Sequence, residues 1–523
     1  MRPRPHGRAQ PITLRRTAAP ELHGDAHVLQ ARTAESRIRN EIRKKPLQVM
    51  KFGGMSVADA AGYRNVVKIV RKASSANNIV VVVSAMKGVT NELVEAAACS
   101  EGGDWRSVTT VLEGLRKKHL GTVDALIPPG ARRESLASNV SELFDYCDRL
   151  CKGTAVLREL TPRVRDAIWS LGERLSAPML VAALIEAGVE SEKVEATDVI
   201  VTDSRHGAAD PSMDLTQERC ETRLRPLLER NIVPVTTGFI GATTEGVLTI
   251  LGRGGSDYSA TIVGAALDAD EVIIWTDVEG VLTADPKQVP DARTVPEMSY
   301  REAAEHAHFG AKVLHPKTLR ALMRCKFPLW VRNTFTPERP GTKITPQGSA
   351  KSRMVKAITA MSEVSMVTVG GPVIASVPDV LGRTFAVTAA IRADILLASH
   401  SSSQNDVCLI VSSAQADRTA ESLRYEFGLD SGQTNVNFVR VNANVAIVTV
   451  IGQNMRATSG VVGRTFGALA RNKVKILATA QGSSESNVSF VVARKDVKAA
   501  LNIAHRELQL GHTRTPPYPR KKS

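Results

Sequence analysis

Cysteine and aromatic residues are scarce in this sequence. Six cysteines in 523 residues give no disulfide framework, and this usage fits a reducing, cytoplasmic compartment. Cys147 and Cys151 lie four residues apart with no second pair nearby, which favours core packing over zinc binding. Aromatic residues make up only 4% of the chain, so no platform for stacking nucleic-acid bases is evident. We expect neither a metal site built by the protein nor a nucleic-acid partner.

Long hydrophobic runs are also missing. A membrane-spanning helix needs about 18–20 apolar residues, whereas the longest run here, Ile79–Ser84, has the length of a buried strand. Residues 1–46 are rich in arginine and contain no apolar core of the kind found in secretory signals. The sequence therefore predicts no membrane partner.

Positive charge is concentrated at the two ends. The net charge is +15, but residues 1–46 carry eleven Lys and Arg against four Asp and Glu, and residues 505–523 carry five against one. The ends therefore hold +11 of the net charge, and the rest of the chain holds only +4. Basic ends of this kind are usually solvated. We expect a disordered basic extension over 1–46 and a basic tail over 505–523.

Two common nucleotide-binding patterns are absent, namely the Walker A pattern and the dinucleotide pattern G-x-G-x-x-G. Short apolar strands alternate instead with helical stretches, which predicts a mostly parallel, open α/β sheet flanked by helices. The expected strands are Val49–Phe52, Asn78–Ser84, Val199–Thr202, Ile232–Thr236 and Ile273–Asp277. Ligands of such sheets bind at the carboxyl ends of the strands.

A lysine and two glycines end the first of these strands. Lys51 supplies a mobile positive charge, and Gly53 and Gly54 lack the Cβ atoms that block a bulky anion. The residues after this turn look helical, so we expect their N–H groups to point at the same anion. The alternative is an ordinary strand-to-helix turn with a surface lysine.

A second glycine-rich turn, Gly252–Asp257, opens another helix. It offers backbone donors, Arg253 for a carboxylate, and Asp257 for an ammonium group or a lysine. Glu173 is suited to pair with an amine, and an ordinary charge pair at a helix start is the alternative.

Two glycine-rich turns, two lysines (Lys51 and Lys312) and several carboxylates together indicate phosphoryl transfer. This chemistry depends on positioning and on charge neutralisation more than on a covalent partner.

The C-terminal part contains an internal repeat with a constant offset. Three pairs of segments match at an offset of 81 residues, namely 366–369 with 447–450, 382–385 with 463–466, and 400–403 with 481–484. Each copy predicts a strand, a loop, a helix, a strand, a polar turn and a strand. The repeat therefore predicts two small α+β units.

Several of these motifs resemble the signatures of aspartate kinase. The matching segments are Lys51–Val57, Gly252–Asp257, Trp275–Val278 and Phe309–Pro316, and the repeat resembles the tandem ACT regulatory modules of that family. Together they cover about residues 47–495. The resemblance implies an amino-acid kinase fold over 47–336, a linker over 337–360, and ferredoxin-like ACT modules over 361–440 and 441–504.

The resemblance implies that ATP and L-aspartate give ADP and 4-phospho-L-aspartate, the first step toward lysine, threonine, methionine and isoleucine. Lys51 would bridge the γ-phosphate and the attacking β-carboxylate, and Asp257 would hold Lys51 and the substrate ammonium. Arg253 would bind the α-carboxylate, and Glu173 the ammonium. Further substrate contacts would come from Ser84, Thr90, Phe239 and Ser256.

The resemblance also implies a nucleotide site with ATP and Mg²⁺. Its residues would be Lys51, Gly53, Gly54, Ser56, Thr276, Asp277, Leu282, Lys287, Lys312 and Val313. Mg²⁺ would bridge phosphates rather than occupy a protein cage. Met55 stands where the family usually has threonine, and Leu282 where many members have tyrosine, so we expect reduced activity.

In the ACT modules, Gln481 and His400 would contact an amino-acid effector, either threonine or lysine. His400 stands where the second copy has Gln481, and simple exposure of this histidine is the alternative. Edge strands of such modules commonly pair across chains, so we expect a homodimer or a higher homo-oligomer.

Two other functions stay open at this point. The first alternative is a kinase for another small acid, such as N-acetylglutamate. The second is a non-catalytic amino-acid sensor, in which Met55 marks a decayed active site. The pairing of Arg253 with Glu173 favours a free amino acid as substrate.

Overall fold

The protein is described here as a computed structural model. The structure describes residues 45–310, 313–323, 325–349, 354–371, 377–401, 406–429, 436, 438–453, 455, 460–481 and 486–511. The expected basic extension lies outside these residues except for its last two, and the expected basic tail is described only as far as residue 511.

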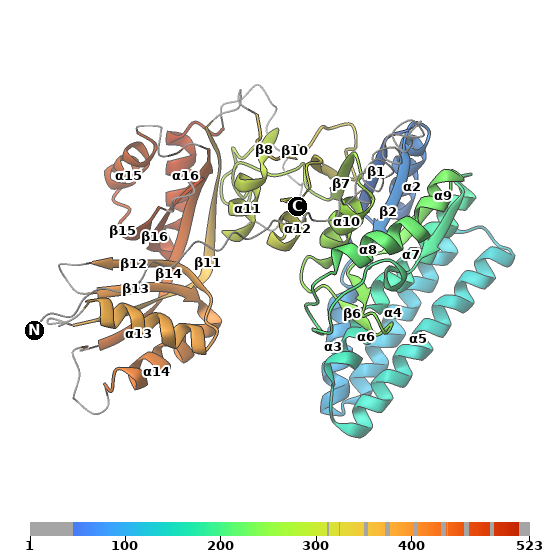
Figure 1. Cartoon of the computed structure of the whole chain (residues 1–523), viewed down its shortest axis with the longest axis horizontal. Helices are drawn as coiled ribbons and strands as arrows, with labels where there is room; N and C mark the ends of the chain where they lie inside the picture. Colours follow the sequence, from blue (N-terminus) through green and yellow to red (C-terminus); the bar gives the residue numbers. More distant parts are fainter. Residues whose placement is uncertain are drawn as a thin grey trace, which may run out of the picture. The chain divides into compact units, whose positions relative to one another are not determined.

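An eight-stranded sheet forms the centre of the N-terminal half (Figure 1). In spatial order its strands are β3 (Ser191–Val194), β4 (Val233–Thr237), β2 (Asn78–Val83), β1 (Leu47–Phe52), β7 (Glu271–Thr276), β9 (Leu329–Asn333), β10 (Thr342–Thr345) and β8 (Glu297–Ser299). All neighbouring pairs are parallel except β9 with β10. This arrangement confirms the predicted open α/β sheet.

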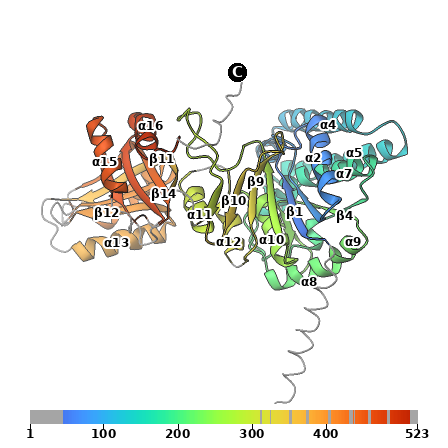
Figure 2. The ribbon, with the colours of Figure 1, turned by 90° about the horizontal axis from the view of Figure 1, so that it is seen from above.

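Helices cover both faces of this sheet (Figure 2). One face packs against α2 (Ala60–Ser74), α3 (Val89–Gly102), α4 (Trp105–Leu126), α5 (Ala131–Leu157), α6 (Pro162–Trp169) and α7 (Leu171–Glu186). The other face packs against α8 (Met213–Arg223), α9 (Arg225–Glu229), α10 (Gly255–Ala266), α11 (Tyr300–His308) and α12 (Pro316–Leu322). A small antiparallel pair, β5 (Ile240–Ala242) with β6 (Leu248–Ile250), lies beside them.

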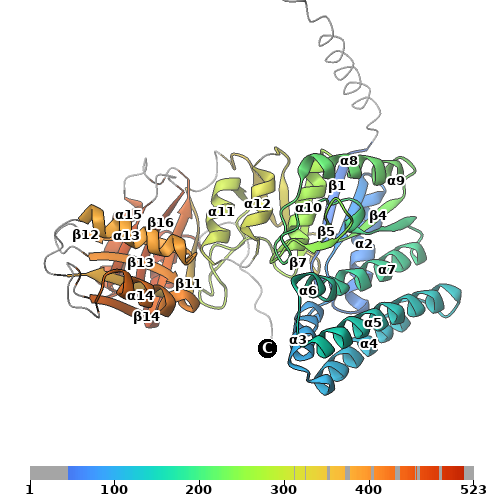
Figure 3. The ribbon, with the colours of Figure 1, turned by 60° about the horizontal axis from the view of Figure 1, so that its bottom comes forward.

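Residues 162–186, which contain α6 and α7, are long and apolar enough to cross a membrane by length and composition. In the fold, 72% of the apolar 18-residue window within this stretch is buried. Figure 3 shows α7 among its neighbouring helices rather than apart from them. Its apolar character therefore reflects its place in the protein core.

Two sequence expectations are corrected in this half. Residues 199–202 do not form a strand but take part only in isolated bridges, Val201 with Ala242 and Thr202 with Pro211. An apolar run of this length fits a buried loop as well as a strand. The expected linker 337–360 contains β10, whose buried and half-buried residues alternate and which lies between β9 and the edge strand β8.

The C-terminal half contains a six-stranded antiparallel sheet that holds both copies of the repeat. In spatial order its strands are β12 (Ile395–Ser401), β13 (Asp406–Ser412), β11 (Val355–Gly370), β14 (Phe438–Gly452), β16 (Asn487–Ala493) and β15 (Ile476–Ala480). Its helices are α13 (Val377–Ala390), α14 (Ala416–Glu426), α15 (Val461–Arg471) and α16 (Val497–Glu507). The predicted pair of α+β modules is confirmed.

The expected boundary between the modules, at residues 440 and 441, falls inside the continuous strand β14. The strands β11 and β14 are long and pair along their whole length, with Val355 opposite Gly452 and Gly370 opposite Phe438. Residues 355–361 therefore pair beside the second module, although they precede the first one in the chain. The repeat in the sequence did not predict this pairing, because β11 and β14 each run through both modules without a break.

Each half of this sheet has its own helical layer. The helices α13 and α14 cover the first half, and α15 and α16 cover the second (Figure 1). A third apolar cluster joins the opposite faces of the two halves, and it includes Phe309 from the N-terminal part of the chain.

The segment 282–293 of the N-terminal half packs into the second module. Three of its apolar side chains are buried in the core beneath α15 and α16, namely Ala284, Val289 and Ala292. Asn502 Nδ2 donates to the carbonyl of Gln288 at 2.9 Å, and the Thr283 hydroxyl bonds Nε2 of His505 at 3.0 Å. This segment is therefore shared between the two halves.

A cavity-forming substitution tests the assignment of residues 355–361 to the second module. Ile358 is fully buried and pairs with Val450. Ile358→Ala is expected to cost about 2–5 kcal/mol of stability. Hydrogen exchange should accelerate in β16 and in residues 447–452, while β12 and β13 keep their wild-type rates. Acceleration confined to β12 and β13 would contradict the assignment.

Candidate active site

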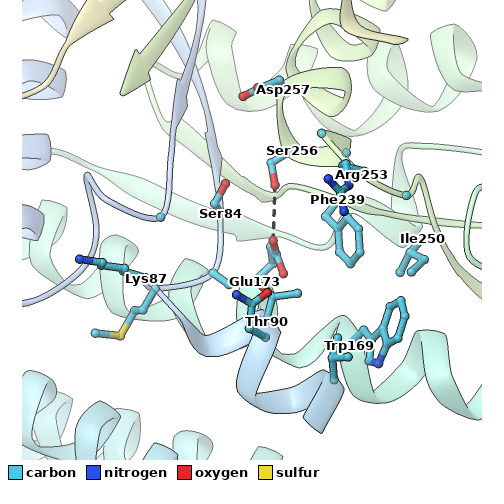
Figure 4. A pocket seen from close by; sticks show the side chains of 18 of the residues that line it. Ser84, Lys87, Thr90, Trp169, Glu173, Phe239, Ile250, Arg253, Ser256 and Asp257 are labelled. Carbon is cyan, nitrogen blue, oxygen red and sulfur yellow. Dashed lines mark hydrogen bonds between the residues drawn. The ribbon is translucent and has the colours of Figure 1, made fainter. Parts of the chain in front are cut away.

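A cavity of about 680 Å³ opens at the carboxyl ends of β1, β2 and β4 (Figure 4). It brings together segments that are far apart in the sequence. All residues with a predicted catalytic or substrate-binding role line its wall, namely Lys51, Ser84, Thr90, Glu173, Phe239, Arg253, Ser256 and Asp257. The roles of these residues stay predictions, but the structure does bring them to one place.

Lys51 and Asp257 form an ion pair in the cavity wall. Lys51 lies near the end of β1, and Asp257 lies in the first turn of α10. The exposed fractions of their side chains are only 10% and 15%. Each charge depends on its partner because an unpaired charge is costly where water is excluded. The pair therefore holds the lysine amine in a defined position within the cavity.

The paired glycines after β1 permit close packing of backbone on backbone. The N–H of Gly53 donates to the carbonyl of Trp275 at 3.0 Å. A Cβ atom on Gly54 would lie 2.9 Å from the carbonyl oxygen of Ala85. Gly54 therefore lets the β1 turn lie directly on the loop that follows β2, and it also lines the cavity.

The following helix does not point its amides at the cavity as expected. Helix α2 begins at Ala60, several residues after the glycines, and none of its residues lines the cavity. Asp59 caps it by accepting from the N–H of Gly62 at 2.9 Å. The sequence interpretation overlooked Asp59, whose side chain already satisfies an amide that an anion would otherwise bind.

The second glycine-rich turn requires its glycines for two reasons. Gly252 and Gly254 have φ values of 81° and 72°, a region that disfavours other residues. A Cβ atom on Gly254 would lie 2.3 Å from Cβ of His315, and one on Gly255 would lie 2.6 Å from Cδ2 of Phe239. The tight turn presents Arg253 in the cavity wall at the start of α10 (Figure 4).

Glu173 is a buried acid beside the ion pair. Ser256 Oγ donates to its Oε1 at 3.4 Å, while Oε2 has no hydrogen-bond partner (Figure 4). Burial raises the pKa of Glu173 to about 7, although hydrogen bonds from the N–H groups of Ala85 and Glu173 itself and the charge of Lys51 act in the opposite direction. The unpartnered oxygen is suited to receive a cationic group.

Phe239 has a left-handed backbone conformation, with a φ of 70°. Its N–H donates to Ser259 Oγ, and its carbonyl accepts from Leu251, both at 2.9 Å. A non-glycine residue in this region is strained, and such residues often mark functional sites. The conformation places the aromatic ring in the cavity wall.

Two residues of the predicted nucleotide site do not present their side chains to the cavity. Ser56 is fully buried, and its hydroxyl bonds Thr334 Oγ1 at 2.6 Å and the carbonyl of Trp275 at 3.4 Å. Leu282 is also buried and bridges to Thr294. The Ser56 hydroxyl thus belongs to the packing of the turn, and only its backbone is left for a nucleotide.

Lys51 and Gly54 line the cavity, whereas the remaining predicted nucleotide residues lie outside its wall. Thr276 ends β7, and its hydroxyl donates to Asp277 Oδ1 at 3.3 Å. Lys287 is exposed, and Val313 packs against the sheet core. Lys312 lies outside the described residues.

Of the two predicted effector residues, one lies on an edge strand of the regulatory sheet and the other directly follows the opposite edge strand. His400 is an exposed residue of β12, and Gln481 is exposed directly after β15. These two strands contact each other. The polar turns 402–403 and 482–484 lie outside the described residues.

Several lining residues carried no sequence motif. They include Asn91, Val94, Trp169, Gly207 and Ile250. Trp169 is one of four tryptophans in the chain, which was the only signal available for any of them. Within the described part of the chain, no group of three or more His, Cys, Asp or Glu side chains is arranged to hold a metal ion.

Replacing Glu173 should change how stability depends on pH. A buried acid whose pKa rises from 4.5 to about 7 binds its proton more tightly in the folded state, so stability falls as pH rises through this range. Glu173→Gln removes this loss. Above pH 7, its free energy of unfolding should exceed that of the wild type by about 3 kcal/mol. The two proteins should be equally stable below pH 4.5.

Urea unfolding across the pH range measures this difference. Glu113→Gln, on an exposed position of α4, is the matched control and should show no pH-dependent difference. Equal stability of Glu173→Gln and wild type at every pH would contradict the raised pKa.

Comparison with known proteins places the chain in a family. Residues 46–333 match the Amino acid kinase family, and residues 448–508 match the ACT domain. The bifunctional aspartokinase/homoserine dehydrogenase 1 of Arabidopsis thaliana is 31% identical over 89% of this chain. The chain spans only about half of that relative, 51% of its length.

A second relative is matched over almost its whole length. Lysine-sensitive aspartokinase 3 of Escherichia coli is 31% identical over 88% of this chain and 98% of its own. The solved structure of E. coli aspartokinase III with aspartate and ADP has a TM-score of 0.75 at 30% identity, covering 88% of this chain and 100% of that one. The chain therefore belongs to the amino acid kinase family, among the aspartokinases.

Proposed function

We propose that the chain transfers the γ-phosphoryl group of ATP to the β-carboxylate of L-aspartate. The observation that supports this proposal most strongly is the composition of the cavity. The Lys51–Asp257 ion pair lies there beside buried Glu173 and the glycine-rich turn that contains Arg253. The E. coli relative was solved with aspartate and ADP, which supports both ligand classes.

The proposed step is a direct displacement at phosphorus. A β-carboxylate oxygen attacks the γ-phosphorus, the bond to the β–γ bridging oxygen breaks, and ADP leaves with that electron pair. No proton transfer is needed because an aspartate side chain is ionised at neutral pH. Both reactants are anions, so their repulsion is the main obstacle that the protein offsets. Lys51 is the cation we assign to this task, with Asp257 holding it in place.

The two ends of aspartate are assigned to different residues. Arg253 binds the α-carboxylate, since a guanidinium matches a carboxylate with two parallel hydrogen bonds. Glu173 binds the ammonium through its unpartnered oxygen. The hydroxyl groups of Ser84, Thr90 and Ser256 complete the polar wall. Aspartate binding then favours the ionised form of Glu173, because the ammonium compensates the buried charge.

The nucleotide is assigned to the carboxyl end of β7, with Thr276 and Asp277. Mg²⁺, when bound, supplies positive charge to the phosphates. The described wall of the cavity offers only two carboxylates, Glu173 and Asp257. Asp257 pairs with Lys51, and Glu173 is assigned to the substrate. We therefore assign Mg²⁺ to the phosphates and water rather than to a protein cage.

The ACT modules are proposed to confer feedback inhibition by lysine or threonine. The E. coli relative was also solved with lysine and aspartate, at a TM-score of 0.71 and 28% identity. Segment 282–293, which carries Leu282 and Lys287, is packed into the second module. A change in that module therefore has a direct route to the nucleotide loop. The edge strands β12 and β15 favour a homodimer.

Loss of the cavity cation tests the proposed reaction. Aspartate-dependent ADP release should occur in the wild type, and Lys51→Ala should lower kcat about 10²–10³-fold because charge stabilisation is lost. Lys68→Ala, on an exposed position of α2, is the control and should keep full activity.

A substrate panel with the same coupled assay separates the alternatives. Turnover with an N-acylated acid but not with aspartate would replace the proposal by a different kinase. Binding of lysine or threonine with no turnover of any substrate would replace it by a sensor.

The proposed regulation is tested at the contact between Asn502 and Gln288. Asn502→Ala removes a hydrogen bond to the nucleotide segment and should weaken inhibition by lysine or threonine about fivefold. The control is Asn472→Ala, which loses a bond of 2.8 Å to Ala468 within the same module. The measurement is the inhibition constant for lysine or threonine at varied ATP concentration. Equal constants for the wild type and Asn502→Ala would argue against regulation through this contact.

A further inference from the structure

A fully buried carboxylate, Asp166, lies behind the cavity wall on α6. Its Oδ2 accepts from Nδ1 of His206 at 2.8 Å and from the N–H of Gly207 at 2.9 Å. The guanidinium of Arg165 lies 3.6 Å from its Oδ1. Burial of a carboxylate is costly without such partners. The three contacts all belong either to α6 itself or to the loop 203–210.

The loop 203–210 is closed on itself. The N–H of Asp203 donates to the carbonyl of Asp210 at 3.0 Å. Arg205 bonds both carboxylates, at 2.7 Å to Asp203 and 2.6 Å to Asp210. These bonds hold the loop in one conformation, and Asp166 attaches its tip to α6.

The tip of this loop touches the turn that carries Arg253. Gly207 lines the cavity and has a φ of 87°. A Cβ atom on Gly207 would lie 2.4 Å from a guanidinium nitrogen of Arg165, and one on Gly252 would lie 2.9 Å from the carbonyl oxygen of Gly207. Gly207 is thus packed between α6 and the glycine-rich turn.

Helix α6 also supplies a residue to the cavity wall. Trp169 is the last residue of α6 and lines the wall beside Phe239 and Ile250 (Figure 4). The guanidinium of Arg165 lies 5.1 Å from the centre of the Trp169 ring. Fixing α6 against the loop therefore fixes both the ring and the tip of the loop.

We propose that Asp166 is a positioning residue for the amino-acid end of the cavity. It acts through the N–H of Gly207 on the Gly252–Arg253 turn, and so sets where the guanidinium meets the α-carboxylate. The inference rests on the proposed function, because it assigns the consequence to aspartate binding. It goes beyond that function because Asp166 neither lines the cavity nor belongs to any of the motifs.

The inference predicts a selective kinetic effect. Asp166→Ala leaves the Gly207 N–H unpaired and should raise KM for aspartate about tenfold, while KM for ATP changes less than about twofold. Asp166→Asn keeps an acceptor oxygen and should restore most of the affinity. His206→Ala leaves the Gly207 bond intact and should change KM for aspartate little.

The control is Asp104→Ala, in which an aspartate that accepts from a backbone N–H at 3.1 Å is removed from the start of α4. It should lower stability without changing either KM. If Asp166→Ala does not fold, Gly207→Ala, which pushes the loop tip away from Arg165 while the carboxylate is kept, tests whether the position of this loop sets KM for aspartate. A lower melting temperature with both KM values unchanged, or a parallel rise in both, would overturn the inference.

Failure of the inference is distinguishable from failure of the proposed function. Absence of aspartate-dependent ADP release in the wild type refutes the function alone. Hydrogen exchange then decides the positioning role without any substrate. Exchange of residues 203–210 and 252–254 should accelerate in Asp166→Ala but not in Asp104→Ala, and unchanged exchange there would overturn the role.

Discussion

A buried ion pair between Lys51 and Asp257 joins the two glycine-rich turns of the cavity. One turn ends the central strand β1, and the other begins α10 on one face of the sheet. Both turns depend on glycine because neighbouring backbone or side chains occupy the space of a Cβ atom. The local geometry of the fold thus serves to hold one cation at the place where two anions are proposed to meet.

The rest of the cavity follows from that arrangement. Glu173 is buried next to the pair, and burial raises its pKa to about 7. An ammonium group that binds beside this acid favours its ionised form, because the two opposite charges compensate each other. Arg253 lies in the other turn, and the ring of Phe239 packs against Gly255 of that turn, so the same packing positions polar and apolar parts of the wall.

The sequence was most informative where chemistry and local geometry coincide. The glycine-rich turns predicted Lys51, Arg253 and Asp257 in one cavity because strand ends of a parallel sheet meet at one edge. It was least informative for contacts between distant segments. Nothing local marks Asp166 as the support of Gly207, and nothing in the repeat shows that residues 355–361 pair beside the second module.

The capping of α2 and the burial of Ser56 show a second limit. The N–H of Gly62 and the hydroxyl of Ser56 could each bind an anion, but Asp59 and Thr334 already bond them, and the motif does not reveal either partner. The regulatory half shows the same limit on a larger scale. Segment 282–293 resembles a nucleotide loop by sequence, whereas in the fold it is also part of the core of the second ACT module.

The central claim is that the Lys51 ammonium neutralises the transferred phosphoryl group. A crystal structure with aspartate and a non-hydrolysable ATP analogue tests it most directly. We expect the terminal phosphate within about 3 Å of Lys51 Nζ, with the β-carboxylate on its other side. A phosphate bound elsewhere, with Lys51 still contacting Asp257 alone, would contradict it.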